Sequence, residues 1–360
     1  MTRIDRFIFV RLLLATLMVL GVLVFIFIVI DFSENSDTFS DRGAELSEIW
    51  SRYYLNYIPE MIRLVSPVAV FVAVLLVAGQ MSERLELTAI KSAGVSFYRF
   101  MVPFLLFATL VTGVLSYLDG YVIPGANTER FDFERQYLAR GTDRIDRSRL
   151  YRQENESTLL TVNYFDNRSA MGYHVRIFRF DDKRVQEIVD AARMEWQEET
   201  RQWRLIRVER RVFTENGIER FSHHQTDTTL SVLPRDMARS TNDIYRLTYP
   251  EIVDYIRSLE RSGVGGVSLP KVQFFGKLFY PLGTIVITLV GLGISTSNRR
   301  KGGRGVLLGT GLIVIFFYLI IMKIIEPFGA SGQLDPLWAA AAPHLLFLFI
   351  SLILIWRAPK

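Results

Sequence analysis

The charged stretch MSERLELTAIKSAGVSFYR occupies residues 81–99 and lies between two long apolar runs. These runs cover residues 64–81 and 100–118, and a helix needs about 20 residues to cross a hydrocarbon core. The charged stretch has helical spacing, and Gly94 supplies a helix stop. A charged helix between two membrane spans cannot lie in lipid, so we expect this one to lie at the membrane surface.

The composition is typical of a membrane protein with one inserted water-soluble domain. Half of the 360 residues are hydrophobic, and they gather towards both ends of the chain while the middle is polar. The chain contains no cysteine, which excludes a disulfide framework, thiol catalysis and a cysteine zinc site. The net charge of +5 is small, and several basic residues adjoin apolar runs, so it does not indicate nucleic-acid binding.

Six apolar runs predict six membrane-spanning helices, the first of them ending at Asp31. They cover residues 12–30, 64–81, 100–118, 278–297, 305–322 and 337–356. Basic residues mark both termini and the loop 299–304, whereas residues 325–336 carry acidic residues and no lysine or arginine. By the positive-inside rule we expect both termini and residues 81–99 in the cytoplasm, and the large polar domain outside.

The polar domain between the third and fourth spans has the pattern of a β-domain with flanking helices. A charged helix is expected over residues 127–139, and a second one carries Ile252, Tyr255, Ile256 and Leu259 on one face. The strand candidates between them are residues 174–180, 185–196, 203–213, 218–221 and 229–233. Successive short strands with polar turns predict an antiparallel sandwich or open roll.

The expected architecture is therefore an α-helical membrane protein of three plus three spans with an inserted antiparallel β-domain outside the membrane. Residues 1–119 would hold three spans and the charged helix at about residues 83–94. Residues 120–271 would form the β-domain with its flanking helices, and residues 272–360 the last three spans.

The sequence predicts no catalytic site, no metal site and no cofactor. It contains no HExxH, GxSxG or Walker A motif. His223 and His224 are adjacent, so on a strand they would face opposite sides and could not readily share a metal ion. The string GGRGVLLGTG at residues 302–311 resembles a phosphate-binding loop only superficially, and we expect it to serve close helix packing.

Ionisable residues lie near the expected outer ends of the spans, where they are costly unless paired, hydrated or reaching the interface. One interpretation is that they are ordinary end-of-span residues. The other is that Arg63 and Lys323 contact the phosphates of an anionic lipid, and that Arg130 and Arg135 continue this path. The sequence leaves both interpretations open.

Six strings together resemble the LptF/LptG (YjgP/YjgQ-type) permeases of lipopolysaccharide export, and the LptG-like branch is the more similar one. They are IDRFI (4–8), VIDFSENSDTF (29–39), YYLNYIPEMIRLVSP (53–67), ERLELTAIKSAGVSFYR (83–99), YVIPGAN (121–127) and KLFYPLG (277–283). The resemblance covers nearly the whole chain and is strongest in its first 140 residues.

The resemblance implies a transport subunit of the bacterial inner membrane without enzymatic activity of its own. Two six-span subunits of this family surround a cavity, a cytoplasmic ABC ATPase dimer drives them, and a periplasmic jellyroll-like domain passes the lipid to bridge proteins. The loop between spans two and three is the family's coupling helix, whose characteristic acidic residue corresponds to Glu86. The coupling residues that we expect are Glu83, Arg84, Glu86, Leu87 and Lys91.

One departure from the family concerns the exit of the first span, where some members carry lysines that contact lipid phosphates. This chain has Asp31, Glu34 and Asp37 there. Either the phosphate contacts lie elsewhere, with Arg63 and Lys323 as candidates, or the lipid carries differently placed phosphates.

Two other functions remain possible from the sequence. A four-span permease of the lipoprotein-release type would place its outer domain after the first span, unlike this chain. A receptor or scaffold would use the β-domain to bind a partner without transport.

Overall fold

The computed structural model describes residues 3–138, 150–155, 157–166, 169–181, 184–214, 217–230, 232, 241–261, 267–297 and 304–357. The chain divides into two compact units. The first comprises Met1–Leu138, Tyr245–Tyr249 and Ser268–Lys360, and the second comprises Ala139–Ile244 and Pro250–Val267.

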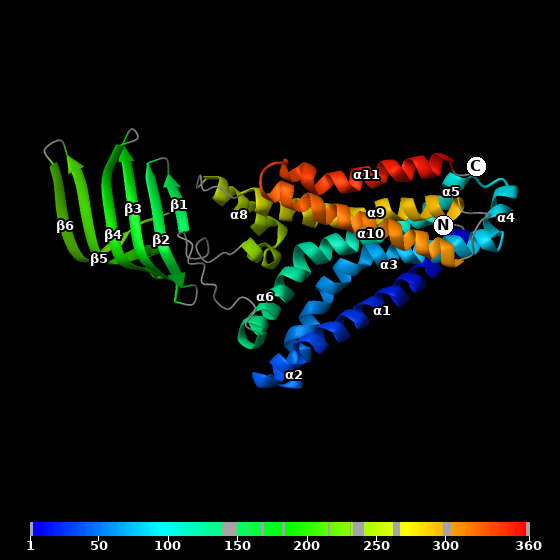
Figure 1. Ribbon diagram of the computed structural model, residues 1–360, viewed down its shortest axis with the longest axis horizontal. Coiled ribbons are helices and arrows are strands. Elements are labelled where there is room, and N and C mark those ends of the chain that lie inside the picture. Colours follow the sequence, from blue (N-terminus) through cyan, green and yellow to red (C-terminus); the bar gives the residue numbers. More distant parts are fainter. Residues whose placement is uncertain are drawn as a thin grey trace. The chain divides into compact units, whose positions relative to one another are not determined.

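The first unit contains six helical segments that are long and apolar enough to cross a membrane, which confirms the expected spans. Its elements are α1 (Arg3–Asp41), α2 (Leu46–Glu48), η1 (Ile49–Tyr54), α3 (Leu55–Glu83), α4 (Glu86–Ser92), α5 (Phe97–Tyr117), η2 (Leu118–Val122), α6 (Ile123–Phe133), η3 (Glu134–Leu138), α9 (Ser268–Ser297), α10 (Arg304–Ala330) and α11 (Pro336–Arg357). The segments η1, η2 and η3 are π-helical. Figure 1 shows α9, α10 and α11 running along the long axis of this unit, with α1 inclined to them.

The first span does not end at Asp31, because α1 continues for ten more residues to Asp41. The hydroxyls of Tyr53 and Tyr54 donate hydrogen bonds to the Asp31 carboxylate at 3.2 and 3.1 Å. Further along α1, Phe39 is 1% exposed and belongs to a buried aromatic cluster with Tyr53, Tyr54 and Phe133. These tertiary contacts support a helix that the local polarity alone would end.

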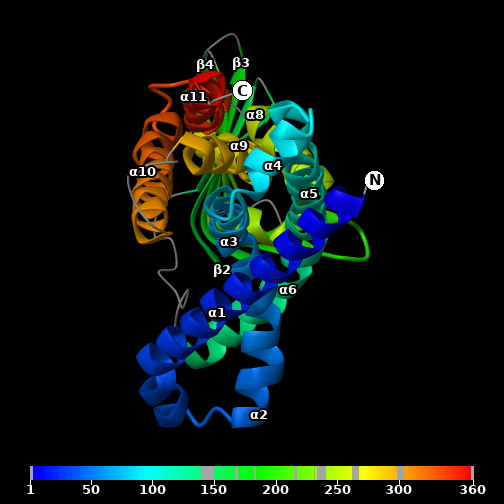
Figure 2. The ribbon, with the colours of Figure 1, turned by 90° about the vertical axis from the view of Figure 1, so that its right-hand side faces the viewer.

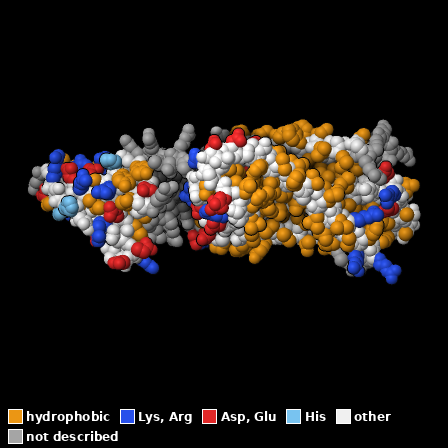
Figure 3. Space-filling view, turned by 90° about the horizontal axis from the view of Figure 1, so that it is seen from below, with side chains coloured by type: hydrophobic (Ala, Val, Ile, Leu, Met, Phe, Trp, Pro, Cys, Tyr) orange, Lys and Arg blue, Asp and Glu red, His pale blue; other side chains and the backbone are white. Residues whose placement is uncertain are grey.

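The helices pack around α3, which lies at the centre of the view along the bundle in Figure 2. Phe71, Val74 and Leu75 on α3 are at most 1% exposed and belong to buried apolar clusters shared with α9. On the face shown in Figure 3, apolar side chains cover most of the helical unit, and charged side chains gather towards its ends. This distribution is the one expected of helices that contact lipid.

Helices α3 and α10 approach closely at Gly311, where a Cβ atom would lie 2.1 Å from Leu75 Cδ1. This agrees with the packing role expected for the glycine-rich string, of which residues 302 and 303 lie outside the described part.

We expect Gly311→Val to lower the free energy of unfolding by about 1–3 kcal/mol through overpacking. Gly309 on the same helix has no atom within 4 Å of its added Cβ, so Gly309→Val is the matched control. Reversible unfolding in detergent would measure both variants, and equal losses at the two positions would contradict close packing at Gly311.

The second unit is built on one antiparallel sheet of six strands in the order β1 to β6 (Figure 1). The strands are β1 (Leu150–Asn155), β2 (Thr158–Asp166), β3 (Met171–Asp181), β4 (Arg184–Gln197), β5 (Gln202–Thr214) and β6 (Gly217–Thr228). The antiparallel β-domain between spans three and four is thereby confirmed. Of the two expected forms, a single sheet with strands in chain order corresponds to the open roll.

The strand predictions were wrong at both ends of the sheet. Strands β1 and β2 were not predicted. In β2, residues 160–162 are buried in succession, so its sequence does not show the alternation of apolar and polar residues that predicts a strand. At the other end, the described residues among 229–233 form no strand. They lie against the apolar face instead, where Leu230 and Val232 are buried and Trp203 Nε1 donates to the Val232 carbonyl at 2.7 Å.

Strict alternation also fails inside the sheet. His174 in β3 and Arg207 in β5 both have a left-handed φ of 52°. In β5 the buried residues on either side of this point are Leu205 and Val208, three positions apart. Left-handed residues therefore shift the inward-facing set by one residue, as β-bulges do.

Two further helical elements follow the sheet, the 3₁₀ helix η4 (Thr241–Arg246) and the helix α8 (Tyr249–Arg261). Ile252, Tyr255 and Ile256 of α8 are at most 8% exposed, which confirms the predicted apolar face. The predicted helix end at residues 262–263 lies outside the described residues.

Candidate functional site

The charged stretch between spans two and three is divided by a backbone break. Helix α3 ends at Glu83, Arg84 follows it, and Leu85 adopts a left-handed φ of 59° before α4 begins at Glu86. The surface helix is therefore shorter than the predicted 83–94, because Glu83 belongs to α3 and Arg84 to the break. A left-handed leucine is sterically unfavourable, so the surrounding structure must hold it.

The end of α4 was predicted correctly. Gly94 has a φ of 83°, its N–H donates to the Lys91 carbonyl at 2.9 Å, and Val95 N–H donates to the Ile90 carbonyl at 3.2 Å. This pair of bonds is a Schellman motif, which favours glycine at the left-handed position. The chain then turns directly into α5, where the Ser96 hydroxyl caps the helix by accepting from Arg99 N–H at 3.3 Å.

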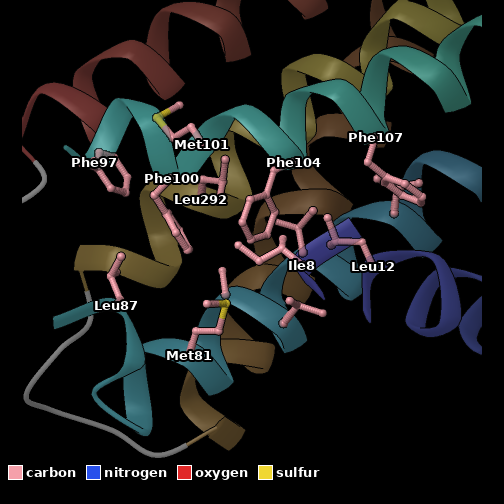
Figure 4. Close-up of a cluster of buried hydrophobic side chains, with 14 of the residues drawn as sticks. Ile8, Leu12, Met81, Leu87, Phe97, Phe100, Met101, Phe104, Phe107 and Leu292 are labelled. Carbon is pink, nitrogen blue, oxygen red and sulfur yellow. The ribbon is translucent and has the colours of Figure 1, made fainter. Parts of the chain in front are cut away.

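Leu87 anchors α4 to the membrane helices, and the partly buried Ile90 packs against the same cluster. Leu87 is 1% exposed and belongs to a buried cluster to which α1, α3, α5 and α9 also contribute (Figure 4). On α5 the cluster contains Phe97, Phe100 and Met101. Motion of α4 therefore disturbs the packing of several spans at once.

The charged residues of this segment remain accessible. Glu83 and Arg84 are exposed, and Lys91 Nζ lies 5.0 Å from the centre of the Phe97 ring. Glu86 Oε2 lies 3.8 Å from Arg11 Nη1 of α1, and both side chains are 31% exposed. This separation is too long for a hydrogen bond, so the Glu86 carboxylate can still accept one from another donor.

A second cluster of charges joins the spans near their other ends. Asp119 on η2 is 1% exposed and lies 3.8 Å from Arg63 on α3 and 3.6 Å from Lys277 on α9. Lys277 is 2% exposed. Charges buried this deeply are retained in spans only when they are paired. Sequence reasoning missed Lys277, and the only signal for it was a single cation at the start of an apolar run.

Arg130 extends this cluster. Its guanidinium donates to Glu60 at 2.6 Å, lies 3.2 Å from Glu134 and stacks 4.3 Å from the centre of the Tyr57 ring. Glu60 also lies 3.8 Å from Arg63. The positive and negative charges of the cluster balance, so Arg63 and Arg130 already have partners within the chain. The cations are Arg63, Arg130 and Lys277, and the carboxylates are Glu60, Asp119 and Glu134.

The other two predicted lipid contacts take no part in this cluster. Arg135 is 42% exposed and forms an ion pair with Asp132 on the same helical segment. Lys323 on α10 is 79% exposed, and its Nζ lies 2.9 Å from Glu326 Oε2. Of the four residues, Lys323 has the most accessible charge.

A short segment of the first unit, Tyr245–Tyr249, packs beside the buried cluster. Arg246 donates to Asp132 at 2.8 Å, and Asn127 Nδ2 donates to the Tyr245 carbonyl at 3.1 Å. The Tyr249 ring lies against Gly120, where a Cβ atom would come within 2.4 Å of it. Burial, with a smaller contribution from the Asp119 carboxylate, raises the pKa of Tyr249 above its usual range.

The family of lipopolysaccharide export system permeases LptF/LptG matches residues 6–357, nearly the whole chain. The chain belongs to this family. It is 22% identical to the lipopolysaccharide export system permease protein LptG of Haemophilus influenzae over 358 residues, which cover 98% of this chain and 97% of that protein. It is also 22% identical to LptG of Escherichia coli K12 over 308 residues, covering 85% of this chain and 84% of that protein.

These matches confirm the LptF/LptG resemblance and its LptG-like character. The match extends through the six spans and the β-domain alike. Together with the six apolar helices, it identifies the chain as a multi-pass membrane protein.

Proposed function

We propose that this chain is a permease subunit of an ATP-driven ABC transporter that extracts lipopolysaccharide from the outer leaflet of the bacterial inner membrane. It would pass the lipid to periplasmic bridge proteins that lead towards the outer membrane. The observation that carries this proposal is the family match across residues 6–357. The short helix α4 between two spans, with Glu86 partly exposed, adds a place where an external motor can act.

The energy must come from outside the chain. Extraction of a lipid with several acyl chains exposes many CH₂ groups to water at about 0.8 kcal/mol each. The sequence has no Walker A motif for nucleotide binding. A cytoplasmic ABC ATPase dimer is therefore the partner that the proposal requires, together with a second six-span permease subunit.

The residues of the α4 segment would divide the coupling between them. Leu87 transmits force because it is buried among the spans, and Glu86 receives it because its carboxylate is accessible. Glu83, Arg84 and Lys91 surround Glu86 with accessible or half-buried charge that can match a charged partner surface.

The proposed orientation places both termini and α4 in the cytoplasm and the β-domain in the periplasm. Arg3, Arg6 and Arg11 at the start of α1 support it through the positive-inside rule. The basic residues at 299–301 support it too, although they lie outside the described residues.

Lys323 is the lipid contact that we retain for direct testing, because its ammonium group is the most accessible of the four. We expect Lys323→Gln to reduce the lipopolysaccharide that co-purifies with the complex several-fold, as loss of a charge-assisted contact predicts. Lys323→Arg keeps the charge and is the control. Unchanged lipid content in Lys323→Gln, measured by mass spectrometry, would remove Lys323 from the lipid site.

Gentle purification of the chain from its native membranes, followed by mass spectrometry of protein and lipid, tests the proposal as a whole. An ATPase, a second six-span protein and a bound multi-acyl glycolipid are the expected companions. Recovery of the chain alone, or with periplasmic proteins only, would favour the receptor or scaffold and overturn the transport proposal.

A further inference from the structure

Helix α1 is packed most deeply against the rest of its unit near its two ends. Its buried residues are Asp5, Ile8, Leu12, Thr16, Asn35 and Phe39. Residues 17–34 are all described, and none of them is buried. The middle part of α1 is therefore packed less deeply than its ends, although Ile28 packs against the aromatic cluster and Asp31 accepts hydrogen bonds from Tyr53 and Tyr54.

The cytoplasmic-side end of α1 is held by an ion pair to the start of α5. The guanidinium of Arg99 donates to both carboxylate oxygens of Asp5, at 2.8 and 2.7 Å. Asp5 is 5% exposed, so its charge is almost fully removed from water. This two-point contact fixes orientation as well as distance, which a single hydrogen bond does not.

The same end of α1 also meets α4. Arg11 lies two turns after Asp5 on α1, and its Nη1 is 3.8 Å from Glu86 Oε2. Ile8 lies between these positions and Leu12 directly follows Arg11, and both belong to the buried cluster that contains Leu87 (Figure 4). Polar and apolar contacts thus join α1 to the segment that includes α4 and the first turn of α5.

We propose that Asp5 and Arg99 are positioning residues that make the first span follow the coupling segment. This inference rests on the proposed transport function. A push on α4 reaches α5 through the short connection of residues 93–96, and the Asp5–Arg99 pair passes it to α1. No residue of 17–27 is buried, so displacement of the first turns of α1 can tilt the helix about the contacts that Ile28 and Asp31 make further along it. The coupling segment then acts on the first span through a fixed polar pair as well as through the apolar cluster around Leu87.

The test uses the full complex in lipid nanodiscs that contain lipopolysaccharide, with the other subunits made cysteine-free. This chain has no cysteine of its own, so Leu17→Cys on α1 and Leu352→Cys on α11 give a single labelled pair. Both positions are 54% exposed and accept spin labels without disturbing buried packing. The distance between the labels is measured without nucleotide and with ATP plus vanadate, beside ATP hydrolysis and lipid release.

In the unmodified pair we expect a nucleotide-dependent change in the distance between the labels. Asp5→Arg should remove this change and lower lipid release about tenfold or more, while ATP hydrolysis stays within about twofold. Asp5→Arg combined with Arg99→Asp should restore the distance change and lipid release, because the ion pair forms again with reversed charges. Asp5→Asn should give an intermediate loss, and Arg6→Gln, which changes an exposed neighbouring charge, should leave both readouts unchanged.

Two outcomes overturn the inference alone. One is a distance change that persists in Asp5→Arg. The other is a loss in Asp5→Arg that the charge-reversed pair does not restore, since a positioning role requires rescue. A complex with wild-type Asp5 and Arg99 that shows neither ATP hydrolysis nor lipid release would overturn the proposed function, and the inference with it.

Discussion

Replacement of Glu86 by lysine is expected to abolish lipid export while the chain still inserts into the membrane and reaches normal abundance. The substitution puts a cation where a motor subunit would meet a carboxylate. It also places that cation next to Arg11, whose Nη1 lies 3.8 Å from Glu86 Oε2 in the native chain. Like charges across a docking surface cost several kcal/mol, which is enough to prevent binding at cellular concentrations.

Abundance in the membrane, ATPase co-purification and lipid release are the three measurements for this variant. Ser92→Lys adds a positive charge to the other end of the same helix, where Ser92 is exposed, and should keep most of the export activity. Glu86→Asp keeps the charge and should lie between the two. Normal export by Glu86→Lys would contradict the coupling role of this residue.

Replacement of Lys277 by methionine should cause the largest loss of stability among single substitutions in the spans. It removes one partner of Asp119, which is 1% exposed, and leaves a buried carboxylate with Arg63 at 3.8 Å as its remaining cation. Breaking one side of a buried ion pair costs about 3–5 kcal/mol. Reversible unfolding in detergent, with membrane abundance as a second measure, would detect this loss.

Lys323→Met is the matched control for this substitution. Lys323 also pairs with a carboxylate, but it is 79% exposed, so its loss should change the free energy of unfolding by less than about 1 kcal/mol. The double variant Lys277→Met with Asp119→Leu removes both charges and should recover most of the stability. Similar losses in the free energy of unfolding for Lys277→Met and Lys323→Met would show that the buried charge cluster does not stabilise the packing of the spans.

The membrane architecture could be predicted because its causes are local in sequence. Long apolar runs, a charged loop and Gly94 each point to one structure, and the six spans and the end of α4 follow from them. The face of α8 with Ile252 and Ile256 was likewise predictable from its 3.6-residue period. The sheet was partly predictable, because the candidates at residues 174–180, 185–196, 203–213 and 218–221 fall within β3, β4, β5 and β6 although left-handed residues interrupt the alternation in β3 and β5.

The remaining features depend on contacts between residues distant in sequence. Helix α1 continues past Asp31 because the hydroxyls of Tyr53 and Tyr54 donate hydrogen bonds to the Asp31 carboxylate. The residues around Asp31 in the sequence do not predict this contact. The segment with Leu230 and Val232 lies against the sheet without joining it, although its composition suits a strand.

The candidate sites divide along the same line. The helical spacing of residues 81–99 predicted a charged helix at the membrane surface, whereas the coupling residues were proposed from the family resemblance. From the sequence, Arg63 was a candidate for binding lipid phosphate. In the structure it lies near two carboxylates, Asp119 from a different helix and Glu60 from the preceding turn of its own helix. A sequence shows a cation near a span end, but only the fold shows whether a carboxylate already neutralises it.

The most direct test of the central claim is release of lipopolysaccharide from proteoliposomes that contain the purified complex of this chain with its ATPase and second permease. With ATP and a soluble acceptor protein, we expect lipid release that falls to background without nucleotide and in Glu86→Lys. ATP hydrolysis without lipid release, or lipid release that does not need ATP, would contradict the assignment of this chain as an ATP-driven export subunit.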